Sequence, residues 1–151
     1  MLAIRPFDWR RDREAVLSFQ REIYETNFPG LAVTPQFLED YGRALKAALN
    51  DEHEGLFVLA DEEGACGFLW VALVGSLVDP WSGYVKNIFV VARYRGQGWG
   101  RALLTRADEW LRARGVSRVE LDCSVVNEEA RRLYERGGYR ATRVRMEKEL
   151  R

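Results

Sequence analysis

Three glycines stand at alternate positions, Gly96, Gly98 and Gly100, between an apolar run and a helix-forming run. Glycine inside a regular element costs about 0.5 to 1 kcal/mol relative to alanine, so this density needs a reason. The preceding residues 82–92, SGYVKNIFVVA, are rich in β-branched and aromatic side chains and predict a strand. The residues after the glycines have helical spacing, with Gly115 placed to end the helix. The stretch therefore predicts a strand, a turn and a helix in direct succession.

Such a turn is suited to binding an anion. Backbone N–H groups and the positive end of the helix dipole converge there, and side chains at the three glycines would obstruct a close approach. A tight turn with close packing would account for one or two of the glycines, and an anion site accounts for all three. The spacing excludes two common nucleotide loops, because no Lys-Ser/Thr pair follows and the third glycine arrives one residue early for G-x-G-x-x-G.

Strand and helix patterns share the rest of the chain, with no repeat or linker between them. Together they predict an α/β protein with a mixed, mostly antiparallel sheet of six to seven strands and about four helices. The expected elements besides the strand and helix above are a strand at 2–6, a helix at 12–22, a helix begun by Thr34 and Pro35, a hairpin over 55–75, a strand over 117–126, a short helix capped by Asn127, and a last strand from Tyr139 to Leu150.

Composition sets limits on the class of protein. The 151 residues fit one domain, residues 1–151, and 23 basic against 23 acidic residues give no reason to expect nucleic acid as a partner. Cys66 and Cys123 are too few for a disulfide framework, and His53 is the only histidine, so no metal site is expected. No signal peptide or membrane-length apolar run is visible, so we expect a cytoplasmic protein with no membrane partner.

Two blocks of the sequence resemble the GCN5-related N-acetyltransferase (GNAT) family. Arg95-x-x-Gly98-x-Gly100 is similar to the family's loop for the acyl-CoA pyrophosphate, and NEEARRLYERGGYR matches a second family pattern from Asn127 to Tyr139. The resemblance extends from about Gly83 to residue 151. It implies acetyl-CoA (coenzyme A) as cosubstrate. The residues it implies for binding the cosubstrate are Ile88, Phe89, Val90, Arg95, Gly96, Gln97, Gly98, Trp99, Gly100, Arg101, Asn127, Ala130 and Tyr134.

Tyr134 is the candidate general acid. By spacing alone it is an aromatic on the buried face of a helix, but the resemblance implies that it protonates the departing CoA thiolate. A phenol with a pKa near about 10 is protonated at neutral pH and suits that role. The resemblance also implies that a backbone N–H near the end of the NIFVV strand polarises the thioester carbonyl. Cys123 alternates with apolar residues, which favours packing over a nucleophilic role.

The general base is less clearly marked. Many relatives carry a carboxylate where this chain has Lys86, and a lysine serves as a base only if its pKa falls by several units. Asp122, five residues before Asn127, is the candidate that the resemblance favours, since relatives that acetylate protein N-termini carry a glutamate there. Two alternatives remain open: Asp122 pairs with an arginine such as Arg118, or a chain of water molecules replaces a dedicated base.

The sequence predicts an N-acetyltransferase that moves an acetyl group from acetyl-CoA to a primary amine, of a small molecule or a peptide, by direct attack in a ternary complex. Phe28 and Trp81, in expected loops, are the candidates for contact with the acceptor. The alternative is a noncatalytic acyl-CoA-binding regulator, which the lysine at position 86 allows. A nucleotide-binding module is disfavoured by the failed loop spacings, and a homodimer is left open.

Overall fold

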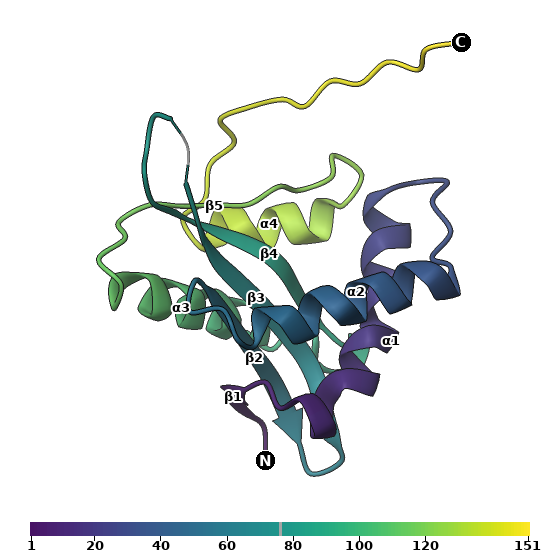
Figure 1. The fold of residues 1–151 in the computed structure, drawn as a ribbon, viewed down its shortest axis with the longest axis vertical. Coiled ribbons are helices and arrows are strands. Elements are labelled where there is room, and N and C mark those ends of the chain that lie inside the picture. Colours follow the sequence, from purple (N-terminus) through teal and green to yellow (C-terminus); the bar gives the residue numbers. More distant parts are fainter. Residues whose placement is uncertain (76) are drawn as a thin grey trace.

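A twisted sheet with the strand order β1-β2-β3-β4-β5 crosses the middle of the molecule in the computed structural model, which describes residues 1–75 and 77–151 (Figure 1). The first four strands are antiparallel neighbours, and β5 lies parallel to β4. The strands are β1 (Ala3–Pro6), β2 (Glu54–Asp61), β3 (Gly64–Val74), β4 (Ser82–Val90) and β5 (Val119–Glu120). The helices are α1 (Trp9–Asn27), α2 (Pro35–Ala48), α3 (Trp99–Arg112) and α4 (Glu128–Arg136), with a short 3-10 turn η1 (Ala92–Tyr94).

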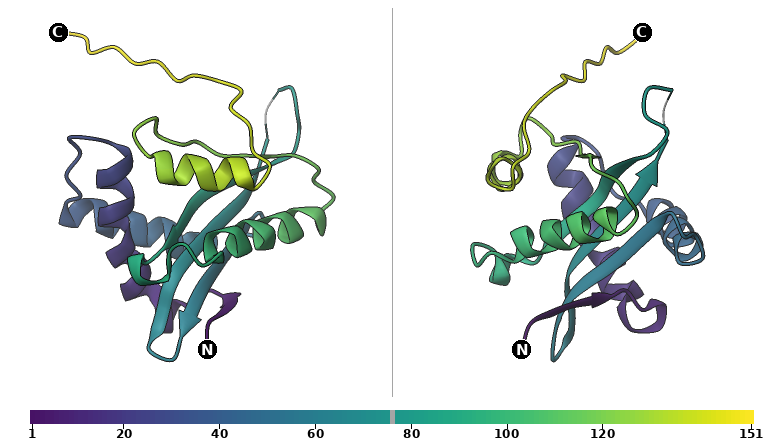
Figure 2. Two further views of the ribbon diagram at one scale, coloured as in Figure 1. Left: turned by 180° about the vertical axis from the view of Figure 1, so that it is seen from behind. Right: turned by 90° about the vertical axis from the view of Figure 1, so that its left-hand side faces the viewer.

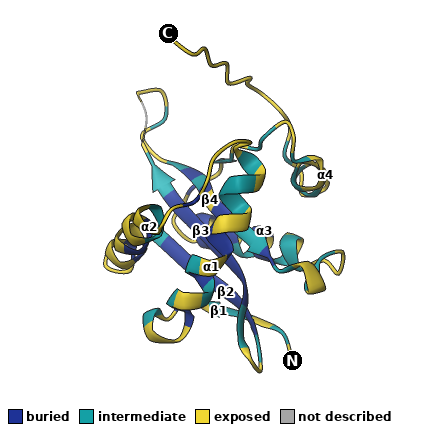
Figure 3. Ribbon diagram, turned by 90° about the vertical axis from the view of Figure 1, so that its right-hand side faces the viewer, coloured by how far each residue is buried: buried dark blue, intermediate teal, exposed yellow. Residues whose placement is uncertain are grey.

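Alternating side chains of the central strands build two hydrophobic layers. On β2, Leu56 and Val58 face α1 and α2, whereas Phe57 and Leu59 face α3. The sheet is therefore covered on both faces, and its middle strands are the buried part of the fold (Figures 2 and 3). Helix α3 presents the residues predicted for its buried face, Leu103, Ala107, Trp110 and Leu111, to this core.

The helix starts follow the capping signals of the sequence. The hydroxyl of Thr34 accepts a hydrogen bond from the amide of Phe37 at 3.1 Å, and Pro35 occupies the first turn of α2, as predicted. The side chain of Asn127 accepts from the amide of Ala130 at 3.1 Å and caps α4. Helix α1 is longer than the predicted range 12–22, because Asp8 caps it earlier.

The predicted sheet was too large. The described residues form five strands rather than six to seven: the strand predicted over 117–126 pairs only at Val119–Glu120, and the last strand predicted from Tyr139 to Leu150 is not formed. Residues 139–151 leave α4 and run away from the sheet as an extended, largely exposed segment (Figure 1). Their alternating pattern is typical of a strand, but no strand formed by the described residues pairs with them. The four predicted helices are confirmed.

A buried ion pair fastens β1 to α1. Asp12 is fully buried, accepts two hydrogen bonds from the guanidinium of Arg5 at 2.7 and 2.9 Å, and accepts a third from the amide of Asp8 at 2.8 Å. Removing one partner of a buried pair leaves an uncompensated charge, which typically costs about 3 to 5 kcal/mol.

We therefore expect Asp12→Ala to lower the free energy of unfolding, measured by urea denaturation, by about 3 kcal/mol. Asp8→Ala is the control, because it removes only an exposed helix cap worth about 1 kcal/mol. Equal losses in the two variants would show that the pair does not stabilise the attachment of α1.

Candidate active site

Strands β4 and β5 are joined only at their first residues. The parallel ladder consists of Gly83 with Val119 and Tyr84 with Glu120, and beyond these pairs the two strands are no longer joined. On its other side β4 stays paired with β3 as far as Val90, but with an irregularity: Trp70 lies opposite Asn87 and Val71 opposite Val85. Lys86 is therefore the extra residue of a β-bulge, which bends a strand and increases its twist. The later part of β4 is thus left with one edge free of a partner strand.

The glycine turn follows this free edge after the short 3-10 turn η1. Gly96 and Gly98 have φ values of 74° and 89°, in the left-handed region that favours glycine, and a Cβ at either would meet nothing within 4 Å. Gly98 is the N-cap of α3 and offers no side chain to bond the first helical amides. The N–H groups of Trp99, Gly100 and Arg101 therefore point out of the helix beside open space, which suits a phosphate group.

Gly100 has a packing role instead. A Cβ there would lie 2.9 Å from Cδ2 of Leu133, so this glycine lets α4 pack closely against the first turn of α3. Just after α4, a Cβ at Gly137 would lie 3.4 Å from Cδ1 of Leu104, an ordinary packing distance. The three glycines of the turn thus satisfy two demands: Gly96 and Gly98 adopt a left-handed backbone conformation, and Gly100 admits α4.

The side chain of Arg95 is held within the chain. Its Nε donates to the carbonyl of Val90 at 2.8 Å, its guanidinium pairs with Glu22 of α1, and its Cζ lies 5.2 Å from the centre of the Phe89 ring. These contacts fix the turn to β4 and α1. Gln97 and Arg101 are exposed at the mouth of the turn, and Ile88 and Phe89 lie just before it on β4.

Tyr134 lies on α4, with its ring 6.0 Å from that of Tyr139. Burial raises the pKa of its phenol well above the usual value, and nearby Cys123 and Tyr139 raise it further. The phenol therefore stays protonated at neutral pH and is a candidate proton donor. Burial also raises the pKa of the Cys123 thiol, so that this cysteine is not activated as a nucleophile.

Asp122 accepts a hydrogen bond from the hydroxyl of Tyr84. This bond links the chain just after β5 to the first part of β4. Burial and this bond raise the pKa of Tyr84 to about 12, so the phenol keeps its proton and the carboxylate is the acceptor. Sequence reasoning did not identify Tyr84. Its signal is present only in the fold, because the parallel register places position 84 beside position 120.

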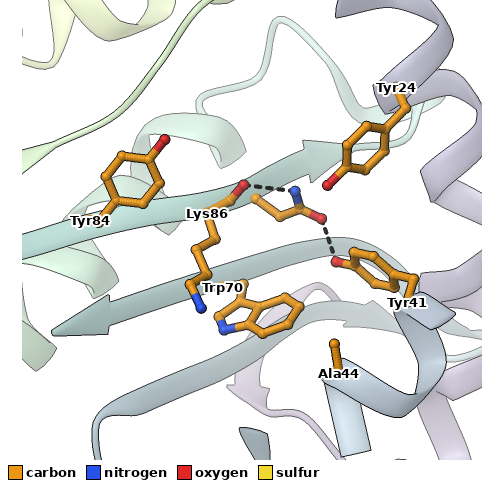
Figure 4. A pocket seen from close by; sticks show the side chains of 7 residues that line it. Tyr24, Tyr41, Ala44, Trp70, Tyr84 and Lys86 are labelled. Carbon is orange, nitrogen blue, oxygen red and sulfur yellow. Dashed lines mark hydrogen bonds between the residues drawn. The ribbon is translucent and has the colours of Figure 1, made fainter. Parts of the chain in front are cut away.

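A cavity of about 330 Å³ opens beside Tyr84 on the face that carries α1 and α2. Aromatic rings form its walls: Tyr41 lies 5.7 Å from Trp70 and 6.4 Å from Tyr24, ring centre to ring centre. The hydroxyl of Tyr41 donates to Oδ1 of Asn87 (Figure 4). The lining residues are Tyr24, Tyr41, Ala44, Trp70, Tyr84, Lys86 and Asn87.

Lys86, on the bulge, extends along the cavity wall. Its ammonium lies beside the Trp70 ring, 4.9 Å from the ring centre (Figure 4). The same ammonium lies 2.7 Å from Oε1 of Glu54 on β2. This chain therefore has a lysine at the position of β4 where the family resemblance leads us to expect a carboxylate. The positive charge of Lys86 is balanced by Glu54 of β2.

The structure places the two predicted acceptor-contact residues outside the lining of this cavity. Phe28 is 55% exposed and stacks on Tyr24, which does line it, at 5.8 Å between ring centres. The ring of Trp81 stacks on that of His53, with 4.9 Å between ring centres, and is not among the residues that line the cavity. Tyr41, whose spacing in α2 is typical of a core position, is both buried and part of the wall. Helical spacing cannot separate these two roles, because one ring edge packs while the other faces the cavity.

Comparison with known proteins agrees with this geometry. The sequence model of the acetyltransferase (GNAT) family matches residues 15–139. An aminoglycoside N(6')-acetyltransferase type 1 of Serratia marcescens is 27% identical over 109 residues, 69% of this chain and 75% of the relative. A putative acetyl transferase from Pyrococcus furiosus has a TM-score of 0.79 and 27% identity, covering 99% of this chain and 100% of the other. A predicted acetyltransferase from Clostridium acetobutylicum, solved with acetyl-CoA, has a TM-score of 0.78 at 17% identity, covering 99% and 96% of the two chains.

These matches confirm the predictions of an acetyltransferase and of acetyl-CoA as its cosubstrate. Among the described residues, no helix has the length and apolar character needed to span a membrane. The chain belongs to the acetyltransferase (GNAT) family.

Proposed function

We propose that this enzyme transfers the acetyl group of acetyl-CoA to a primary amine held in the aromatic cavity, by direct attack in a ternary complex. The observation that carries the proposal is the uncapped start of α3 at Gly98, which follows β4, the strand whose Tyr84, Lys86 and Asn87 line the cavity. The pyrophosphate of CoA binds the amides of Gly98 to Arg101, and its thioester arm follows β4 between the separating strands.

The chain supplies a group for each proton that the reaction moves. A backbone N–H of the free edge of β4 polarises the thioester carbonyl, which accumulates negative charge as the amine attacks. The amine gives its proton to Asp122, directly or through Tyr84 and water. Tyr134 gives its proton to the departing thiolate, since its phenol stays protonated at neutral pH.

The cavity supports a small acceptor whose amine sits on a flat or apolar group. A volume of about 330 Å³ is at the low end of small-molecule sites, and the rings of Tyr24, Tyr41 and Trp70 offer apolar surface with faces that attract a cation. Lys86 is paired with Glu54, and Asp122 brings a carboxylate to the cavity residue Tyr84, where Glu120 and Arg145 also act electrostatically. An arylalkylamine or a short alkylamine fits this combination better than an acidic peptide.

A noncatalytic acyl-CoA-binding protein is the second candidate, because the Lys86–Glu54 pair stands where a base is found in many relatives. Release of free CoA thiol, measured over a panel of arylalkylamines, alkylamines and peptides, distinguishes the two. The proposal predicts turnover that is highest with arylalkylamines. Binding of acetyl-CoA without thiol release over the whole panel would favour the second candidate.

Loss of the Tyr134 hydroxyl tests whether this residue is the general acid. Tyr134→Phe removes one hydroxyl from a packed ring and should lower kcat by about 10²- to 10⁴-fold, with little change in the Kd of acetyl-CoA. Tyr139→Phe is the matched control, since this neighbouring phenol is also buried but has no hydrogen-bond partner in the described structure. Near-normal turnover with a lowered Tm in Tyr134→Phe would return that residue to a packing role.

Loss of the Asp122 carboxylate tests whether this residue is the general base. Asp122→Asn should lower kcat/KM more at pH 7 than at pH 10, because at high pH the amine is already neutral and needs no base. Tyr84 keeps its proton over most of this range, since its pKa is about 12, so its titration does not produce the profile. Glu120→Gln, on the same side of β5, is the control and should leave the pH profile unchanged. An equal loss at every pH in Asp122→Asn would make Asp122 a structural partner of Tyr84.

A further inference from the structure

Lysine is scarce in this chain, and one of its lysines lines the aromatic cavity. The 23 basic residues are arginines except for Lys46, Lys86 and Lys148. Lys46 and Lys148 are exposed, the first on α2 and the second in the segment after α4. Lys86 instead lines the cavity beside Trp70 (Figure 4). Because a lysine side chain ends in a primary alkylamine, the cavity holds an amine of the protein itself where the acceptor amine is proposed to bind.

The β-bulge of β4 brings Lys86 to this position. Lys86 and the next residue, Asn87, both line the cavity, although successive residues of a regular strand point to opposite faces. Asn87 belongs to the edge of β4 that has, among the described residues, no strand partner on the side away from β3. Lys86 thus stands between the cavity and the edge along which the thioester arm is proposed to run.

The contacts of the Lys86 ammonium hold it in place and give it an acceptor for a proton. Nζ lies 2.7 Å from Oε1 of Glu54, whose side chain is only 13% exposed. Oε2 of Glu54 accepts a hydrogen bond from Nε1 of Trp70 at 3.4 Å, which fixes the carboxylate. The side chain of Lys86 is 38% exposed, so its amine is still accessible from the cavity.

We propose that the enzyme acetylates its own Lys86 when acetyl-CoA is bound and the cavity holds no free amine. This inference rests on the proposed function, because it uses the same cosubstrate, the same cavity and the same acid. An amine that is fixed beside the thioester reacts as an intramolecular partner and needs no binding step of its own. Lys86 is therefore a modification site of the chain, with the bound acetyl-CoA as the donor.

The transfer replaces the C–S bond of the thioester with a bond from Nζ to the carbonyl carbon. Nζ gives one proton to Glu54, which passes it to water, and the lone pair that remains attacks the carbonyl. The departing thiolate takes the proton of Tyr134, and the second proton from the nitrogen restores this phenol through water. The product is a neutral amide, so acetylation leaves the Glu54 carboxylate without its cation at the cavity wall.

Mass spectrometry after incubation with acetyl-CoA, in a buffer without free amines, tests the proposal. We expect one added acetyl group on Lys86, formed about tenfold or more faster than on Lys46 or Lys148. Lys46 is the matched internal control, because its ammonium also lies over a tryptophan ring, 5.5 Å from the centre of Trp9. The rate per chain should not depend on protein concentration. Equal labelling of the three lysines, or a rate proportional to protein concentration, would overturn the proposal.

A second donor and a charge-conserving variant distinguish transfer from bound acetyl-CoA from simple exposure. Acetyl phosphate carries an acetyl group without CoA, so it should label the three lysines without a preference for Lys86. The same preference with both donors would overturn the proposal. Lys86→Arg keeps a positive charge beside Glu54 but has no amine to acetylate, and its mass should stay unchanged with acetyl-CoA. One added acetyl group in this variant would place the site elsewhere and would also overturn the proposal.

The label on Lys86 and the release of thiol with free amines report on different proposals. Turnover of the amine panel by a chain whose Lys86 stays unlabelled would overturn self-acetylation and leave the proposed function intact. A labelled Lys86 without turnover of any free amine would support self-acetylation and contradict transfer to a free acceptor. The absence of both signals would overturn both proposals.

Discussion

The parallel ladder between β4 and β5 stops after two residue pairs, and the candidate site depends on that interruption. Strand β4 is held to β3 on its other edge, while the bulge at Lys86 bends it. Among the described residues, the backbone of Asn87 to Val90 has no strand partner on the side away from β3. A buried amide needs a partner, so this edge is a place where a ligand can supply one.

The glycine turn and α4 complete the site from opposite directions. Left-handed Gly96 and Gly98 reverse the chain at the end of β4 and begin α3 without a side-chain cap, and Gly100 admits Leu133 of α4. Tyr134 is thereby carried on a helix that packs against the glycine turn, the candidate anion site. The contact between Asn127 and Asn27, at 3.1 Å, ties the start of α4 to the end of α1. Acid, anion site and cavity wall thus share one framework.

Local signals in the sequence predicted the parts that depend on local physics. Capping by Thr34 and Asn127, the buried face of α3 and the strand before the glycines follow from spacing and side-chain type. Contacts between distant segments could not be predicted in this way: the Tyr84–Asp122 bond spans 38 positions, and the Lys86–Glu54 pair spans 32. The last strand, predicted from Tyr139 to Leu150, is not formed, because a local sequence pattern does not show that a partner edge is available.

We propose that the amides at the start of α3 bind the acyl-CoA pyrophosphate. The most direct test compares the affinity for acetyl-CoA of two variants, each with one charge reversed at one end of α3. Arg101→Glu places a carboxylate in the first turn, where the helix dipole favours it by about 0.3 to 1 kcal/mol, so the Tm should hold or rise. The same carboxylate repels a pyrophosphate, and the account predicts a Kd for acetyl-CoA raised about tenfold or more. Arg112→Glu, in the last turn, should lower the Tm and leave the Kd unchanged. Equal affinity in Arg101→Glu and the wild-type chain would contradict the account.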